Sequence, residues 1–398
     1  MSIPQTLITQ AIAWRRAFHA APELGFEEHT TAQRIASLLL SFGLEVNREF
    51  AVTAVVGTLR NGPGPVIGLR ADMDALPIQE LGQCEYRSVY PGRMHACGHD
   101  GHSAILLAAA AHLSATRQFS GTVHFIFQPA EENLAGGQKM VEDGLFEHFP
   151  MDAIYALHNW PGLPEGHIVV NAGPMMASQD TFEITLTGKS CHAAMPESGA
   201  DPIIAAAQLI MGLQTISSRR VSPKDAIVIS VTQLNAGEVI NSIPETATLR
   251  GTVRCLSPQV RTTAISIMED MVRQIPAGFG VAGRLSYRSG YPVTLNDPQA
   301  AAAAYRAAIE VVGPARATFG AEPSMAAEDF AFMLQVCPGA YLWLGAGDDA
   351  GTVGLHHPHY DFNDAIIETG VNLWTRLIEQ SCPLHGTPAQ LNMTQGIS

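Results

Sequence analysis

The chain has 398 residues, of which 46% are hydrophobic and 15% are charged, a composition typical of a folded globular protein. At this length two domains are expected, because a single hydrophobic core rarely grows so large. The formal net charge is −14 and the basic residues are scattered along the chain, so nucleic acids and anionic membranes are poor partners.

The sequence also bears on location and on the cysteines. The N-terminal segment MSIPQTLITQAIAWRRAF lacks the basic-then-apolar order of a secretory signal. The longest apolar stretch, around residues 104–111, is far shorter than the roughly 20 residues that span a bilayer, and it predicts a buried helix.

The six cysteines are widely spaced and form no CxxC pair, which argues against a disulfide framework or a zinc finger. We therefore expect a cytoplasmic protein with mostly buried, reduced thiols.

Strand-like and helical runs alternate in the first part of the chain. The pattern predicts strands at 54–60, 66–75, 122–130 and 152–160, and helices at 102–115 and 136–144. Such alternation is typical of an α/β domain, with a central mixed sheet and helices on its faces. Reactive groups in these folds lie on loops at strand ends.

A different order begins near residue 180. Strands are expected at 181–188, 226–234, 246–256 and 284–291, with helices at 201–218 and 257–275. This β-α-β-β-α-β order is the ferredoxin-like one. After residue 296 the chain predicts helices around one more strand, 341–347. We therefore expect an inserted module at 180–294, within a first domain formed by 1–179 and 295–398.

The segment MHACGHDGHS is the densest cluster of reactive side chains. Cys97 and His99 are two residues apart, and Gly98 between them permits a turn that would bring a thiolate and an imidazole to one cation. Asp100 could orient a ligand histidine. A helix-capping turn with incidental histidines is the alternative interpretation of this segment alone.

Three further segments carry potential ligands. Glu131 and Glu132 follow an apolar strand, and His158 follows another; His356 lies in the loop GLHHPHYDFND. Taken singly, the glutamates would be a solvated loop and each histidine a structural residue. Together with Cys97 and His99, they match a two-metal hydrolytic site, which needs about five or six ligands and one carboxylate that is free to act as a base.

These residues lie in a series of motifs that resembles a known family, the aminoacylase and carboxypeptidase-like metallopeptidases, and in particular its hippurate hydrolase or N-acyl-amino-acid amidohydrolase branch. The resemblance covers nearly the whole chain. Its motifs are, in order, RRAFHAAPELGFEE, RADMDALPIQE, MHACGHDGHSA, FQPAEE, HNWPG, CHAAMPESGADPI, NSIPETATLRGTVR, AAEDFAFM and LHHPHYDFND.

The resemblance implies a role for each matching residue. The metal ligands would be Cys97, His99, Glu132, His158 and His356, and Glu131 would be the general acid/base. His356 is preferred to His357 because the last ligand of the family stands two residues before a proline, here Pro358.

The inserted module would act as a lid and a dimerisation domain. His192 matches a histidine that reaches the reacting carbonyl, often in the partner subunit. A structural loop histidine before a helix start is the alternative interpretation of His192.

Asn241 and Arg254 match binders of the substrate carboxylate, although Arg254 could equally form a salt bridge within the lid. Asp72 and Asp74 stand where other branches carry a metal-binding histidine followed by an aspartate. This chain lacks that histidine and has the motif CGHDGH instead, which argues against direct metal binding by Asp72, and Asp74 is expected to support a ligand.

The predicted activity is hydrolysis of N-acyl-L-amino acids with two divalent ions, Mn²⁺ or Zn²⁺ by resemblance, with Co²⁺ or Ni²⁺ as alternatives. A homodimer or higher homo-oligomer is expected. A dipeptidase or carboxypeptidase of the same architecture is the nearest rival, followed by a non-catalytic metal-binding protein. No GxSxG, GxxxxGK[ST] or GxGxxG motif is present, which disfavours a serine hydrolase and a nucleotide enzyme.

Overall fold

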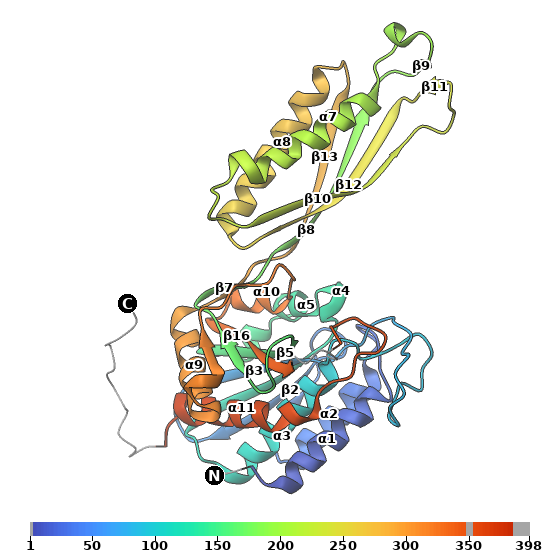
Figure 1. Ribbon diagram of the computed structural model, residues 1–398. Coiled ribbons are helices and arrows are strands. Elements are labelled where there is room, and N and C mark those ends of the chain that lie inside the picture. Colours follow the sequence, from blue (N-terminus) through green and yellow to red (C-terminus); the bar gives the residue numbers. More distant parts are fainter. Residues whose placement is uncertain (1–2, 348–352, 385–398) are drawn as a thin grey trace. The chain divides into compact units, whose positions relative to one another are not determined.

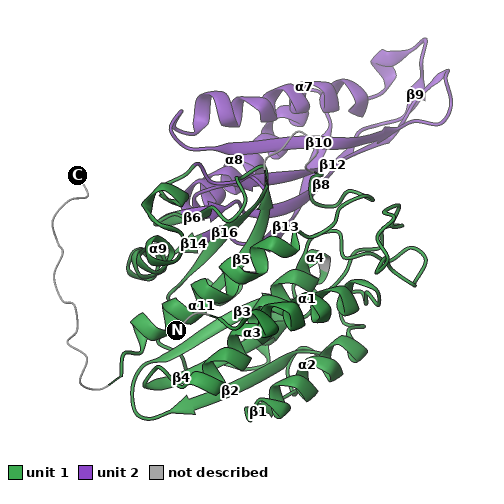
Figure 2. Ribbon diagram, turned by 60° about the horizontal axis from the view of Figure 1, so that its bottom comes forward, with its two compact units in different colours: residues 1–173, 295–321, 332–398 green, residues 174–294, 322–331 purple. Residues whose placement is uncertain are grey.

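The computed structural model describes residues 3–347 and 353–384. The chain forms two compact units: one comprises residues 1–173, 295–321 and 332–398, and the other residues 174–294 and 322–331 (Figure 2). The segment 322–331, which the sequence predicts to be part of the first domain, belongs to the second unit. The reason is visible in its hydrogen bonds, because Ser324 donates to Met175 and the Ala177 amide donates to Ser324.

Unit 1 contains an eight-stranded mixed sheet with the strand order β1-β2-β4-β3-β5-β16-β6-β15. Strands β3, β4, β5 and β16 run parallel, whereas β2 is antiparallel to β4 and β6 to β16. The strands are β1 (Glu45–Asn47), β2 (Val55–Asn61), β3 (Val66–Asp72), β4 (Gly121–Gln128), β5 (Ala153–Pro161), β6 (Ile168–Val170), β15 (Ala317–Phe319) and β16 (Gly339–Gly347). The sheet confirms the predicted mixed α/β class.

Helices cover the sheet of unit 1. Helices α3 and α11 pack against its central strands, and α4 and α5 lie on the other side of the sheet (Figure 1). The helices are α1 (Gln5–His19), α2 (His29–Ser41), α3 (His99–Thr116), α4 (Glu131–Leu134), α5 (Gly136–Glu142), α6 (Leu145–His148), α9 (Pro298–Val312) and α11 (Ile367–Ser381), with short 3₁₀ turns at Pro314–Arg316 and Asp364–Ile366.

The central strand β4 and helix α3 of unit 1 are buried in its hydrophobic core. Every residue of β4, GTVHFIFQ, is buried, as expected for a strand covered on both faces. Helix α3 is apolar on all sides beyond its first turn, and it is buried nearly throughout, as predicted for 104–111. This burial fixes the N-terminal end of α3, which carries the segment Cys97–His102.

Unit 2 contains a four-stranded antiparallel sheet of order β10-β12-β8-β13, with a core shared by the sheet and two helices. Its element order is β-α-β-β-α-β, and the strands alternate between buried and exposed residues because the helices cover one face. The elements are β8 (Gln179–Thr187), α7 (Pro202–Thr215), β10 (Ile227–Ala236), β12 (Thr246–Cys255), α8 (Pro258–Ala277) and β13 (Ala282–Tyr291), with a π turn at Ile216–Arg220 and, towards the tip, β9 (Cys191–His192), a 3₁₀ turn at Pro196–Ser198 and β11 (Ser242–Ile243).

Local signals start the helices of unit 2. The Asp201 carboxylate accepts the Ile203 amide at the start of α7, and Ser257 does the same for Val260 in α8. A proline follows each cap at the first helical position, where its missing N–H costs nothing. Three elements lie at the boundaries of the units: β7 (Gly173–Met176), β14 (Thr294–Asn296) and α10 (Phe330–Leu334).

Among residues 3–347 and 353–384, no helix combines the length and apolar character that a membrane crossing requires.

Candidate metal centre

The turn Cys97-Gly98-His99 enters α3 with a backbone that only glycine adopts easily. Gly98 has a φ of 94°, and a Cβ atom at this position would lie 2.2 Å from Asn159 Oδ1. The turn places Cys97 Sγ 3.4 Å from His158 Nε2. His158 lies within β5 rather than after it, so the sheet itself holds this imidazole opposite the thiol.

The two glutamates follow the end of β4. Ala130 has a φ of 57°, which turns the chain sharply, so that Glu131 and Glu132 begin the short helix α4. Glu132 Oε1 lies 3.9 Å from His99 Nε2 and 3.3 Å from His356 Nε2. The Glu132 carboxylate therefore stands between two of the predicted ligand histidines.

His356 reaches this carboxylate from the loop before α11. Its backbone is in the left-handed region, with a φ of 61°, and its amide donates a 2.8 Å hydrogen bond to Ala96. A strained non-glycine residue next to a group of candidate ligands is typical of a functional site. The hydrogen bond ties the His356 loop to the segment that carries Cys97.

The donor atoms form overlapping groups that fit divalent cations. The ligand atoms of Cys97, Glu132 and His356 lie within 4.8 Å of one another, and so do those of His99, Glu131 and Glu132. In the described part of the chain, His99 Nε2 and Glu132 Oε1 are buried without a hydrogen-bond partner. Such orphaned atoms are costly unless something pairs with them. Glu132 belongs to both groups, and this set of thiol, imidazole and carboxylate donors would suit divalent cations.

Electrostatics favour a cation at this place. Burial and the nearby carboxylates of Glu132 and Glu131 raise the pKa of the Cys97 thiol well above its usual value. Burial lowers the pKa of His99, but the surrounding carboxylates, first Asp72 and then Asp74, outweigh it and raise that pKa to about 10. Negative charge has thus accumulated in a buried place, and a divalent cation would compensate it and favour the thiolate.

Two aspartates at the end of β3 support the histidines. Asp74 Oδ1 accepts His99 Nδ1 at 3.1 Å, and its other oxygen accepts the Glu132 amide at 3.1 Å. Asp72 pairs with His102 Nδ1 at 2.6 Å. Asp74 therefore lies directly beside His99, one of the predicted ligands.

Asp100 contacts a different residue from the one expected. The sequence predicts that Asp100 orients a ligand histidine, but Asp100 Oδ2 accepts a hydrogen bond from His19 Nδ1 of helix α1 at 2.8 Å. His99 has Asp74 as its partner instead, because the first turn of α3 directs neighbouring side chains to different faces.

Five polar residues around this centre were given no role from the sequence. His102 Nε2 lies 2.6 Å from Asn159 Oδ1, so both of its ring nitrogens are engaged, and Asn159 donates to Tyr360. Arg15 and His19 are also buried here. They are four residues apart on α1 and therefore share a face, a signal that was available in the motif RRAFH.

The remaining predicted residues belong to unit 2. His192 and Asn241 are exposed on the ribbon formed by β9 and β11, where the Ala193 amide donates to the Asn241 carbonyl at 3.0 Å. Arg254 lies on β12 and donates to the Met325 carbonyl at 3.0 Å and to Gln179 Oε1 at 3.3 Å.

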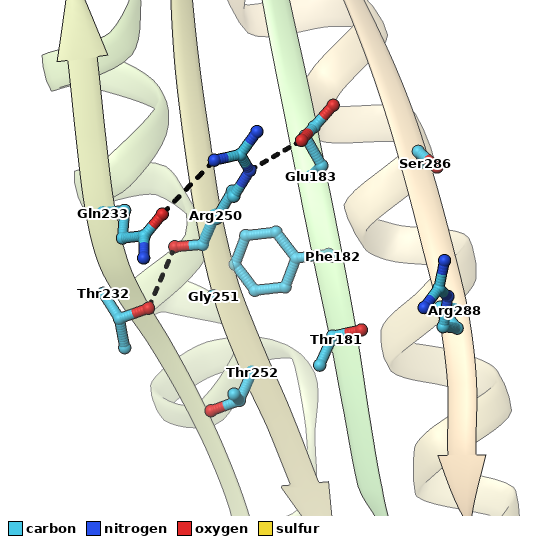
Figure 3. A pocket seen from close by; sticks show the side chains of 10 residues that line it. All are labelled: Thr181, Phe182, Glu183, Thr232, Gln233, Arg250, Gly251, Thr252, Ser286 and Arg288. Atoms are coloured by element: carbon cyan, nitrogen blue, oxygen red, sulfur yellow. Dashed lines mark hydrogen bonds and ion pairs between the residues drawn. The ribbon is translucent and has the colours of Figure 1, made fainter. Parts of the chain in front are cut away.

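A separate depression lies on the sheet of unit 2, over strands β8, β10, β12 and β13. Arg250 lies within it and donates to Glu183 at 2.7 Å (Figure 3). It contains none of the predicted site residues.

Comparison with known proteins decides the family. Residues 68–380 match the model of the peptidase family M20/M25/M40. The chain belongs to this family. It is 40% identical to the hippurate hydrolase of Campylobacter jejuni, over 91% of this chain and 94% of that enzyme. It is 42% identical to the N-acyl-L-amino acid amidohydrolase of Geobacillus stearothermophilus, over 72% of this chain and 78% of that enzyme.

A solved structure supports the same family assignment. The Bacillus subtilis YXEP protein, described as a dinuclear metal-binding peptidase of the M20 family, superimposes with a TM-score of 0.84 at 36% identity, over 94% of this chain and 98% of that one. The resemblance and the enzyme class predicted from the sequence, a metallopeptidase-like amidohydrolase, are confirmed.

Proposed function

We propose that this M20 protein hydrolyses N-acyl-L-amino acids to a carboxylic acid and a free amino acid, with two divalent ions bound by Cys97, His99, Glu132, His158 and His356. The observation that carries the proposal is the position of the Glu132 carboxylate between His99 and His356, next to the buried Glu131. When bound, the ions would supply Lewis acidity that polarises the amide carbonyl and lowers the pKa of a water.

Glu131 is the proposed general base and acid. Its side chain is buried beside the ligand Glu132, at a strand end where substrate can approach. The carboxylate takes a proton from water as the oxygen attacks the carbonyl carbon. It then gives this proton to the leaving nitrogen, so that the C–N bond breaks to release a neutral amine.

Unit 2 is the proposed lid and dimerisation domain, and its β-α-β-β-α-β order supports a ferredoxin-like fold. The exposed imidazole of His192 suits stabilisation of the negative oxygen that forms on the carbonyl, either in its own subunit or in a partner. Dimer formation and a cytoplasmic location stay predictions.

Arg254 is the proposed binder of the substrate carboxylate. Its guanidinium is half-buried, burial lowers its pKa, and both of its hydrogen bonds go to neutral oxygens. Within the described residues it forms no ion pair, which favours this role over a salt bridge in the lid. A carboxylate would complete the planar donor fork of the arginine. Asn241, exposed beside β11, is the proposed second contact.

One assay tests the proposal and its nearest rival together. The protein is stripped with a chelator, re-supplied with Mn²⁺, Zn²⁺, Co²⁺ or Ni²⁺ one at a time, and given hippurate, N-acetyl amino acids and dipeptides. We expect Mn²⁺ or Zn²⁺ to restore hydrolysis of the N-acyl amino acids in preference to dipeptides. Faster cleavage of dipeptides would favour a dipeptidase. No turnover with two bound ions would favour a non-catalytic metal-binding protein.

A further inference from the structure

A buried ion cluster lies behind the turn that carries Cys97 and His99. His19, from helix α1, bridges two carboxylates: its Nδ1 atom lies 2.8 Å from Asp100 Oδ2 and its Nε2 atom lies 3.2 Å from Glu80 Oε1. The His19 side chain is 0% exposed and that of Asp100 is also 0% exposed. Burial lowers the pKa of His19, but the hydrogen bonds to Asp100 and Glu80 outweigh it and raise the pKa to about 9. The imidazole is therefore an imidazolium near neutral pH and donates from both nitrogens.

This bridge ends next to a predicted metal ligand. Asp100 is the neighbour of His99 in the first turn of α3, and its carboxylate contacts His19 of α1. Because both bonds of the His19 imidazolium are charge-assisted and exclude water, they restrict the rotation of this turn. Glu80 is held in turn by the Ser88 amide, at 2.6 Å from its Oε2 atom.

The same helix also holds the second ligand-bearing loop. Arg15 lies one turn before His19, and its Nη2 atom donates to both Asp361 Oδ1 and the Phe362 carbonyl at 2.6 Å. Its Nε atom lies 2.9 Å from Asp364 Oδ1. These acceptors belong to the segment that follows His356. Arg15 thus restricts the far side of the loop whose near side is tied to Ala96.

We propose that Arg15 and His19 of helix α1 are positioning residues, which align the His99 turn and the His356 loop so that their ligand atoms meet at Glu132. This inference rests on the proposed function, since it needs cations at the predicted centre. In this inference, neither Arg15 nor His19 touches the substrate or a cation. Their effect passes through Asp100 to His99 and through the segment 361–364 to His356.

Cation binding distinguishes this positioning role from that of an ion pair that only stabilises the fold. A structural pair would affect the free energy of unfolding, whereas a positioning pair must also change the affinity for cations and the ligand field around them. Cobalt(II) reports on both: a thiolate ligand gives a charge-transfer band in the near ultraviolet, and the visible bands respond to coordination geometry.

The main variant is His19→Gln, which keeps one amide donor group but cannot bridge two carboxylates as a cation. The metal-free variant is loaded with cobalt(II), and the affinity, the thiolate band, and kcat and KM on an N-acyl amino acid are measured. We expect the cobalt affinity to fall by about 10–100-fold, the visible bands to shift, and kcat to fall by a similar factor with little change in KM.

Asp180→Asn is the matched control in unit 2. Asp180 is as deeply buried as Asp100; it pairs with Arg261 and accepts the Tyr287 hydroxyl at 2.7 Å. This variant should lose thermal stability yet keep the cobalt affinity and spectrum of the unaltered protein.

A second variant keeps the test decisive if His19→Gln does not fold. Glu80→Gln removes one of the two charges that hold His19 and leaves one acceptor oxygen in place of two, so that either the His19 or the Ser88 contact is lost. An intermediate loss of cobalt affinity is expected. If the folded His19→Gln or Glu80→Gln protein binds cobalt with unchanged affinity and spectrum, the inference is wrong. If the unaltered protein itself shows no thiolate band, the proposed metal centre fails instead.

Discussion

Asp74 connects two of the predicted ligands: one carboxylate oxygen accepts the His99 ring at 3.1 Å and the other accepts the Glu132 backbone amide at 3.1 Å. It thereby fixes which nitrogen of His99 faces the centre and where α4 begins. In Asp74→Asn an NH₂ group replaces one of the two acceptor oxygens, so the hydrogen bond to either the His99 ring or the Glu132 amide is lost. We expect the affinity for zinc or manganese to fall by about 10–100-fold, measured by competition with a chromophoric chelator. Unchanged affinity would show that the contact is incidental.

Glu131→Gln should separate catalysis from metal binding. The amide has nearly the shape of the carboxylate but cannot take up a proton, so kcat should fall by about 10²–10⁴-fold while the metal content stays near that of the unaltered protein. Glu142→Gln, an exposed glutamate at the end of α5, is the control and should keep full activity. Near-normal turnover by Glu131→Gln would refute its assignment as the base.

Cys97→Ser should weaken metal binding, whereas Cys337→Ser should not. Cys97 Sγ lies with Glu132 and His356 in one group of potential ligands, while Cys337, also buried, belongs to no such group among the described residues. Loss of a supporting partner alone costs about 10–100-fold in affinity, so loss of a ligand should cost at least as much. Metal content after dialysis is the measurement. Equal losses from both variants would contradict a specific role for Cys97.

Gly98→Ala should destabilise the protein more than Gly92→Ala. Both glycines have positive φ values, 94° and 73°, so both substitutions introduce backbone strain of about 1 kcal/mol or more. Only at Gly98 would the added Cβ atom also meet Asn159 Oδ1, at 2.2 Å, whereas nothing lies within 4 Å at Gly92. We expect a difference in unfolding free energy of about 1–3 kcal/mol, measured by urea denaturation. Equal losses would mean that the turn can relax.

Glu28 gives the metal-free protein a specific pH dependence. Burial raises its pKa from 4.5 to about 7, despite a hydrogen bond from Thr53. A raised pKa means that the folded state prefers the protonated form, so this contribution to stability is present below pH 4.5 and is lost as the pH rises toward 7. Glu28→Gln removes an ionisation penalty of up to about 3 kcal/mol. The variant should be more stable than the unaltered protein at pH 8 and similar to it at pH 4, by thermal unfolding. Equal stability at pH 8 would contradict the shift.

Local patterns in the sequence were sufficient for much of the fold. The mixed α/β class and the β-α-β-β-α-β order follow from hydrophobic periodicity and from turn residues, which act over a few residues. Strands β1, β6 and β15 are three residues long, too short for a period to be visible, and β15 corrects the expectation of a single strand after residue 296. Helices α1 and α2 were not predicted as elements.

The sequence by itself determined which side chains are candidate ligands, because a thiol, imidazoles and paired carboxylates in glycine-rich or strand-end segments together favour a metal site. Only the tertiary structure decided which of them meet. His99 and His102 are alike in sequence, yet His102 has both nitrogens engaged while His99 directs a free Nε2 atom toward Glu132. Asp100 meets His19 across 81 positions and Arg15 meets Asp361 across 346. Such pairs are set by the packing of helices on the sheet, which brings distant segments together, and no local pattern records it.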